Sequence, residues 1–271
     1  MSADPNAPLG VFDSGLGGLT VVRALAARLP HESIVYLGDT ARVPYGSKSH
    51  ETVIRYALGC ARVLVDRGVK ALVVACNTVS AVALDPLRVE FDLPVLGVIT
   101  PGARAAVRAA SGGPIGVLAT RGTVASGAYP RAIAALSTRA EVVAVPAPLL
   151  VPLAEEGWTE GEVPSLVVAR YLEPLVAGGA RSIVLGCTHF PLLRDVIAST
   201  AERMFGRPIP IVDSADATSE EIETFLRERS LSAAGQARTL ELLVTDVPKS
   251  FAEVASRFLG HEVESVRAID L

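Results

Sequence analysis

The stretch Ala71-Leu-Val-Val-Ala-Cys-Asn-Thr78 decides the fold of this chain. It is a short apolar run that ends in a cysteine and two small polar residues, and helical spacing of apolar residues begins directly at Val79. A buried parallel strand that leads into a helix has this pattern, so the run predicts such a strand, with Cys76 at its carboxyl end. In open α/β sheets, ligands bind at that end of the strands.

A second segment repeats the pattern. Residues 68–78 match residues 179–189 position by position in residue type, so that Cys187 takes the place of Cys76. These are two of only three cysteines in 271 residues. The match predicts two similar halves, each with a central strand that ends at a thiol.

The order of the expected elements predicts an α/β fold of two pseudo-symmetric, three-layer lobes. Apolar runs alternate with helical patterns along the whole chain, as in domains with mainly parallel sheets. Residues 100–102 and 207–210 interrupt this alternation and predict where the chain crosses between lobes. We expect residues 1–98 with 210–271 to form the lobe that carries Cys76, and residues 99–209 to form the lobe that carries Cys187. An active-site cleft should separate them.

Several individual segments carry further expectations. We expect a strand over residues 94–99, one helix over residues 126–136, a proline-spaced loop over residues 146–157 and a helix over residues 248–259. Residues 14–20 form a glycine-rich turn after the first strand. A dinucleotide-binding fingerprint would need a glycine at position 20, where the chain has a threonine. The turn is therefore predicted to approach a small ligand and not a nucleotide.

Composition narrows the functional classes. The net charge is −4 and the sequence pI is about 5.7, which gives no electrostatic basis for binding nucleic acid or an anionic membrane. Residues 1–8 lack the basic start and apolar core of a secretory signal, and no run approaches the roughly 18 to 20 apolar residues of a membrane span. An odd number of cysteines does not form a disulfide framework. We expect a cytoplasmic protein.

The paired cysteines favour acid–base chemistry at one carbon. A helix start beside each thiol is expected to lower its pKa. If both thiols face one cleft, one thiolate can remove a proton from carbon while the other thiol protonates the opposite face. Cys60 lies in a helical apolar stripe and is expected to be structural. No metal site is expected, because neither matched cysteine has a Cys-x-x-Cys partner and only His189 is near in sequence.

Four short segments resemble the glutamate racemase branch of the aspartate/glutamate racemase family. They are Asp13-Ser-Gly-Leu-Gly-Gly-Leu19, Pro44-Tyr45-Gly46, Ala75-Cys76-Asn77-Thr78 and Gly186-Cys187-Thr188-His189. The resemblance implies that the protein interconverts L- and D-glutamate without a cofactor. It implies that the D-glutamate serves the synthesis of bacterial peptidoglycan, and that the protein is a homodimer. It implies that Cys76 takes the α-proton of the D isomer and Cys187 that of the L isomer.

The resemblance also implies a set of substrate contacts. Asp13 and Ser14 would contact the ammonium and carboxylate groups of the substrate. The side-chain carboxylate would meet Pro44, Tyr45 and Gly46, and the α-carboxylate would meet Asn77, Thr78 and Thr188. His189 is expected as a further substrate contact. Thr120 and Thr123, in the second strand-to-helix turn, are expected as further contacts. Fixed donors of this kind stabilise the negative charge that develops when a weak base removes an α-proton.

Asp13, His189 and Glu155 resemble the residues that assist thiol deprotonation in the family. Each also has an ordinary structural role open to it. Asp13 can cap a helix, His189 can pack or cap, and Glu155 can be a solvated loop carboxylate, with Glu156 as an alternative to it.

Other functions fit parts of the pattern. An aspartate or hydantoin racemase, or an enzyme like maleate isomerase, would use the same scaffold. A two-lobed amino-acid-binding protein would need no thiol pair. A pyridoxal enzyme would need a Schiff-base lysine, and the chain has lysines only at 48, 70 and 249. Binding to DNA gyrase occurs in the family, and nothing in this acidic chain indicates it.

Overall fold

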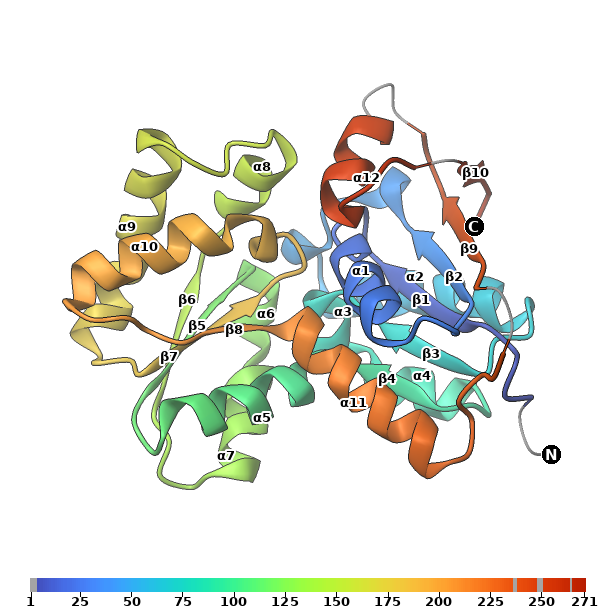
Figure 1. Cartoon of the computed structure of the whole chain (residues 1–271), viewed down its shortest axis with the longest axis horizontal. Coiled ribbons are helices and arrows are strands. Elements are labelled where there is room, and N and C mark those ends of the chain that lie inside the picture. The colour runs from blue at the N-terminus through green and yellow to red at the C-terminus, as the bar shows by residue number, and fades with distance from the viewer. Residues whose placement is uncertain (1–3, 236–237, 248–250, 264) are drawn as a thin grey trace.

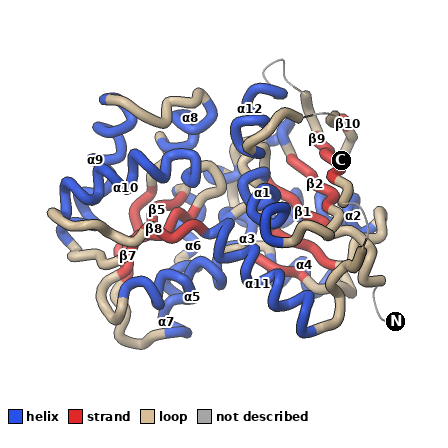
Figure 2. The backbone as a smooth tube through the Cα atoms, viewed as in Figure 1, coloured by secondary structure: helices blue, strands red, loops and turns tan. Residues whose placement is uncertain are grey.

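Two parallel sheets organise the computed structural model, which describes residues 4–235, 238–247, 251–263 and 265–271. The first sheet has six strands in the order β10-β9-β2-β1-β3-β4, and the second has four in the order β6-β5-β7-β8. All of the paired strands are parallel. Helices cover both faces of each sheet (Figures 1 and 2). The predicted α/β class with mainly parallel sheets is confirmed.

The strands are short and mostly buried. Their bounds are β1 (Leu9–Asp13), β2 (Ile34–Gly38), β3 (Ala71–Val74), β4 (Val95–Gly97), β5 (Ile115–Ala119), β6 (Val142–Pro146), β7 (Ser182–Gly186), β8 (Ile211–Asp213), β9 (Leu240–Val244) and β10 (Arg267–Ala268).

The helices alternate with these strands. Their bounds are α1 (Leu19–Arg28), α2 (His50–Val65), α3 (Asn77–Val82), α4 (Leu84–Glu90), α5 (Ile99–Ala110), α6 (Arg121–Ser126), α7 (Ala128–Leu136), α8 (Leu150–Glu155), α9 (Glu162–Ala177), α10 (Arg194–Phe205), α11 (Ser214–Glu228) and α12 (Phe251–Leu259). Three short 3-10 turns cover Thr40–Arg42, Tyr45–Ser47 and Phe190–Leu193. No helix in the described part of the chain combines the length and the apolar character that a bilayer crossing requires.

Alternate residues of the first sheet pack into different cores. Val11 and Val73 face a core that includes α1, whereas Phe12 and Val74 face a core that includes α2. Because successive strand side chains point to opposite faces, strands covered on both sides become continuously apolar. This explains why the run that begins at Ala71 has no polar alternation.

The two sheets repeat one arrangement. Leu9 of β1 pairs with Ala71 of β3, and Ile115 of β5 pairs with Ser182 of β7, so the matched segments occupy equivalent places. The order β2-β1-β3-β4 in the first sheet corresponds to β6-β5-β7-β8 in the second. Thr120 directly follows β5, just as Ser14 directly follows β1, so these two residues also occupy equivalent places.

This repeat corrects the predicted end of the second lobe. We expected residues from 210 onward to return to the first lobe, but β8 pairs with β7 and completes the second sheet, as β4 does beside β3. The helices that follow these strands cross over instead. After β4, helix α5 packs against β7, and after β8, helix α11 packs against α1.

Three other expectations differ from the structure. Residues 146–157 contain helix α8, the strand expected over 94–99 ends at Gly97, and the helix expected over 126–136 is divided into α6 and α7 at Gly127. The helix expected over 248–259 is present as α12 over Phe251–Leu259, and residues 248–250 lie outside the described part of the chain. Prolines explain two of these differences. Pro101 and Pro152 both lie in the first turn of a helix, where no intrahelical N–H donor is required.

Candidate active site

Both matched cysteines line one cavity of about 390 Å³. It lies where the carboxyl ends of the two sheets meet, as expected for a ligand site in an α/β fold. The residues that line it are Ser14, Gly15, Leu16, Val43, Pro44, Tyr45, Gly46, Ser47, Cys76, Asn77, Thr78, Thr120, Arg121, Pro148, Val151, Pro152, Glu155, Cys187, Thr188 and His189. The thiols therefore share a single ligand-sized space.

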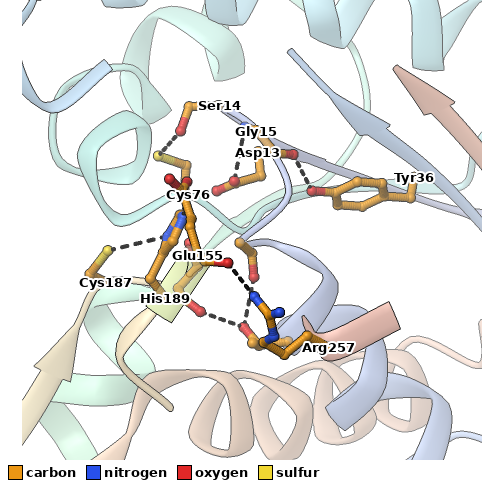
Figure 3. A network of polar contacts seen from close by, with 12 residues as sticks. Asp13, Ser14, Gly15, Tyr36, Cys76, Glu155, Cys187, His189 and Arg257 are labelled. Atoms are coloured by element: carbon orange, nitrogen blue, oxygen red, sulfur yellow. Dashed lines mark hydrogen bonds and ion pairs between the residues drawn. The ribbon is translucent and has the colours of Figure 1, made fainter. Parts of the chain in front are cut away.

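Cys76 lies between β3 and α3, and its thiol contacts the side chain of Ser14. The Cys76 Sγ is 3.5 Å from the Ser14 hydroxyl (Figure 3). The neighbouring Asp13 is buried, and its Oδ2 accepts a hydrogen bond of 3.0 Å from the Gly15 N–H. Burial, and then the nearby Asp13 charge, raise the pKa of Cys76 to about 12. The expected lowering of the pKa by the helix start is not seen, because α3 is short and the thiol is buried.

Asp13 is held behind Cys76 rather than in the cavity wall. Burial raises the pKa of its carboxyl, against the opposing effects of His189 and of hydrogen bonds from Gly15 and Gly18. Its Oδ1 has no hydrogen-bond partner among the described residues. A buried carboxyl with a raised pKa beside a thiol can exchange a proton with it.

Cys187 has a different set of neighbours. Its Sγ is 3.8 Å from Nδ1 of His189, and Nε2 of His189 is 3.0 Å from a carboxylate oxygen of Glu155 (Figure 3). Burial opposes the charge of the imidazole, but hydrogen bonds to Cys187 and Glu155 outweigh it and raise the pKa of His189 to about 10. A protonated His189 can therefore donate to a thiolate at Cys187. A 3-10 turn, and not the expected α-helix, follows this thiol.

Polar groups of the two halves meet on one wall of the cavity. The hydroxyls of Thr78 and Thr120 are 2.9 Å apart, and Thr123 contacts both. The Tyr129 hydroxyl donates a hydrogen bond of 2.8 Å to Oδ1 of Asn77, whereas the buried Nδ2 of Asn77 has no partner among the described residues. The Asn77 amide therefore has a free donor beside the cavity, where it suits a carboxylate.

The loop after β2 supplies a further part of the cavity wall. Tyr45 is buried, and its hydroxyl donates to Asp39, which also accepts from Arg42 Nε at 2.7 Å and from the Thr245 hydroxyl at 2.8 Å. Because the Tyr45 hydroxyl is engaged in this way, this segment can offer a ligand its backbone groups and its ring. A Cβ at Gly46 would lie 3.0 Å from Thr120, so the loop approaches the second half closely.

Most of the predicted site residues are gathered around this cavity. Asp13 and Thr123 are the exceptions, since they lie behind its wall in contact with residues that line it. Glu155, and not Glu156, contacts His189. Our sequence analysis did not identify Arg121, Val43 or Val151 as lining residues. Arg121 directly follows Thr120 in the repeated strand-to-helix turn, so the repeat itself could have indicated it. Among the described residues, no group of three or more His, Cys, Asp or Glu side chains could hold a metal ion.

Comparison with known proteins gives consistent matches over the chain. A family model described as Asp/Glu/Hydantoin racemase matches residues 19–222. Glutamate racemase from Geobacter metallireducens is 47% identical over 264 residues, covering 97% of this chain and 96% of that protein. Glutamate racemase from Neisseria meningitidis is 46% identical over 266 residues, covering 97% of both chains.

Solved structures show the same arrangement. The glutamate racemase of Francisella tularensis in complex with D-glutamate has a TM-score of 0.91 and 35% identity, covering 98% of both chains. The glutamate racemase of Thermus thermophilus in complex with beta-chloro-D-alanine has a TM-score of 0.86 and 41% identity, covering 99% of this chain and 98% of that one.

Proposed function

We propose, since this chain belongs to the Asp/Glu/Hydantoin racemase family, that it interconverts L- and D-glutamate without a cofactor. One observation carries the proposal: Cys76 and Cys187, each just beyond the carboxyl end of a strand, line the same cavity. A binding protein would need no second thiol there. The product D-glutamate would serve the synthesis of peptidoglycan.

The substrate fits the donors around the cavity. We propose that Asn77, Thr78 and Thr188 hold the α-carboxylate, with the free Nδ2 of Asn77 as one donor. The segment Pro44-Tyr45-Gly46, with Thr120, would hold the side-chain carboxylate. Ser14 and Asp13 would meet the ammonium group. Glutamate is favoured because the similar proteins of Geobacter metallireducens and Neisseria meningitidis act, by their names, on glutamate.

The conversion of L- to D-glutamate would begin at Cys187. Its thiolate removes the α-proton, so that the Cα–H bond breaks, an S–H bond forms and the electron pair is delocalised into the α-carboxylate. Donors to that carboxylate stabilise the charge. Cys76 then gives its proton to the opposite face of Cα and becomes a thiolate. The reverse reaction uses the same groups in the opposite order.

The surroundings of the two thiols suit a proton donor at Cys76 and a proton acceptor at Cys187 before the L isomer reacts. The raised pKa of Cys76 favours a thiol that is ready to donate a proton. On the other side, the raised pKa of His189 provides a cation, whose Nδ1 lies 3.8 Å from the Cys187 sulfur that removes the proton. We propose that His189, held by Glu155, assists Cys187, and that Asp13 assists Cys76 by accepting or returning its proton.

The remaining parts of the proposal concern organisation. We propose two lobes, residues 1–98 with 214–271 and residues 99–213, as supported by the pairing of β8 with β7. A homodimer and a cytoplasmic location are supported by the family resemblance alone. Binding to DNA gyrase has only that same support.

Racemisation can be tested with matched variants. Purified protein, without added cofactor, should change the optical rotation of either glutamate isomer until a racemic mixture remains. Cys76→Ser and Cys187→Ser should each lose this activity, because a hydroxyl is a far weaker acid than a thiol. Cys60→Ser is the control, since Cys60 is buried within helix α2 and does not line the cavity. Racemisation retained by both of the first two variants would refute the mechanism.

A further inference from the structure

We propose that helix α12 positions the acid–base group of one thiol only: Arg257 and Phe258 hold the pair Glu155–His189 in place beside Cys187. Neither residue lines the cavity that contains the thiols, so neither is expected to contact substrate. They would act as positioning residues for the half of the reaction that occurs at Cys187. The inference rests on the proposed racemase function.

Arg257 secures the end of α8 that carries Glu155. Its Nη1 donates a hydrogen bond to the backbone carbonyl of Glu155 (Figure 3). A Cβ at Gly157 would lie 2.9 Å from Cζ of Arg257, so the guanidinium packs directly on the chain just past the helix. The last carbonyls of a helix lack intrahelical partners and carry partial negative charge, which a guanidinium satisfies.

The guanidinium is itself held from the other side. Nη2 of Arg257 is 3.0 Å from the carboxylate of Glu253, one turn earlier in α12. This contact leaves Nη1 directed at α8. The position of Glu155 is thus fixed by a charged group that has two partners.

Phe258 acts on the other member of the pair. Its ring is buried and meets the ring of His189 edge-on, with centroids 5.0 Å apart and an interplanar angle of 78°. Such edge-to-face pairs are favourable and restrict the orientation of both rings. Arg257 therefore contacts Glu155, and the next residue of α12, Phe258, contacts His189.

The support is confined to one thiol. Helix α12 follows β9 of the first sheet and packs against α1. The contacts of Arg257 and Phe258 nevertheless reach Glu155 and His189, which lie on the side of Cys187. On the other side, Asp13 accepts from the N–H groups of Gly15 and Gly18, and Ser14 contacts Cys76; none of these partners belongs to α12. Loss of the support should therefore slow proton transfer at Cys187 and leave transfer at Cys76 unaltered.

Isotope effects distinguish the two transfers. Arg257→Met keeps the apolar stem and removes the donors, and Arg203→Met is the matched control, because Arg203 is an exposed residue in the last turn of α10. The measurement is the primary deuterium isotope effect on kcat/KM with each isomer of glutamate deuterated at Cα. With the L isomer the effect reports proton removal by Cys187, and with the D isomer it reports removal by Cys76.

We expect Arg257→Met to lower kcat by roughly tenfold, which corresponds to the loss of one charge-assisted hydrogen bond. The isotope effect should rise with the L isomer and fall with the D isomer, because transfer at Cys187 becomes more rate-limiting. Phe258→Leu should shift both effects in the same directions. The Arg203→Met control should match the unmodified protein. A general loss of structure would lower activity without this opposite shift.

A second measurement tests whether Arg257 acts through Glu155. In a Glu155→Gln background, Arg257→Met should have little further effect on kcat, since the group it positions is already removed. Unchanged isotope effects in both α12 variants, or losses that multiply in the double variant, would overturn the inference. A protein that does not racemise glutamate at all would instead refute the proposed function.

Discussion

Gly17 and His189 lie in direct contact across the boundary between the two halves. A Cβ at position 17 would be 2.6 Å from Nδ1 of His189 and 2.3 Å from the Thr188 hydroxyl. Beside it, the Thr20 hydroxyl donates a hydrogen bond of 3.0 Å to the carbonyl of Thr188. Since Nδ1 is also the atom that faces Cys187, the glycine-rich turn of the first half sets the room available to this histidine.

The first prediction concerns that contact. Gly17→Ala should lower kcat at least tenfold, because the added methyl group must displace His189 or Thr188 from the position beside Cys187. Overpacking of this kind also costs about 1–3 kcal/mol of stability. Steady-state kinetics and urea unfolding measure the two effects.

Gly59→Ala provides the control for this variant. Gly59 lies inside α2, and a Cβ there meets nothing within 4 Å. The change should leave kcat unaltered and raise stability by about 0.5–1 kcal/mol, as is usual for a helix interior. Equal activity of the two alanine variants would contradict the importance of the contact at Gly17.

The second prediction concerns the orientation of Asn77. Tyr129→Phe removes the donor that holds Oδ1 of Asn77, so the amide can turn and present its oxygen to the substrate carboxylate. We expect kcat/KM to fall by roughly five- to tenfold, which corresponds to a net hydrogen bond of about 1 kcal/mol. Tyr171→Phe also loses a hydroxyl that contacts a backbone N–H, but this partner is Leu149 and not Asn77, so the variant should retain kcat/KM. Similar values for both variants would show that Tyr129 does not orient the amide.

The third prediction is a pH dependence of stability. The pKa of His189 is raised from its ordinary value of 6.5 to about 10, so its protonated form is favoured in the folded protein. The resulting stabilisation is fully present below pH 6.5 and is lost as the pH rises through about 10. The difference in urea midpoint between the unmodified protein and His189→Gln should therefore shrink between these two pH values. A difference that grows over this range would contradict the charged His189.

The fourth prediction concerns a buried ion pair away from the cavity. The Lys70 ammonium is 2.5 Å from the Glu32 carboxylate and also donates to the carbonyls of Pro5 and Leu231. Lys70→Met leaves Glu32 buried without a counter-charge and should lower stability by about 3–5 kcal/mol. Activity per folded molecule should not change, because neither residue lines the cavity. A loss of activity at full folding would contradict this separation.

The central parts of the site could be predicted because they are local and repeated. A strand-to-helix turn is encoded in consecutive residues, and its recurrence around Cys76 and Cys187 identifies both thiols. Pairing between distant segments is not encoded in this way. The three residues of β8 carry too little pattern to indicate which sheet they join, so their pairing with β7 was not predicted.

The supporting residues escaped prediction for a related reason. Tyr129, Arg257 and Phe258 belong to helices whose sequences show only ordinary amphipathic spacing, and their contacts arise from packing between distant segments. Helix α8 was taken for a loop because prolines are frequent around it, although Pro152 lies in its first turn.

The most direct test of the two-thiol account is the fate of hydrogen at Cα in D₂O. During the early conversion of L-glutamate, the D-glutamate product should carry one deuterium at Cα, because Cys76 delivers a proton that has exchanged with solvent. The remaining L-glutamate should stay unlabelled, because Cys187 holds the proton it removed. Product that retains the original hydrogen, or label that appears equally early in the unreacted isomer, would contradict two thiols acting on opposite faces of one carbon.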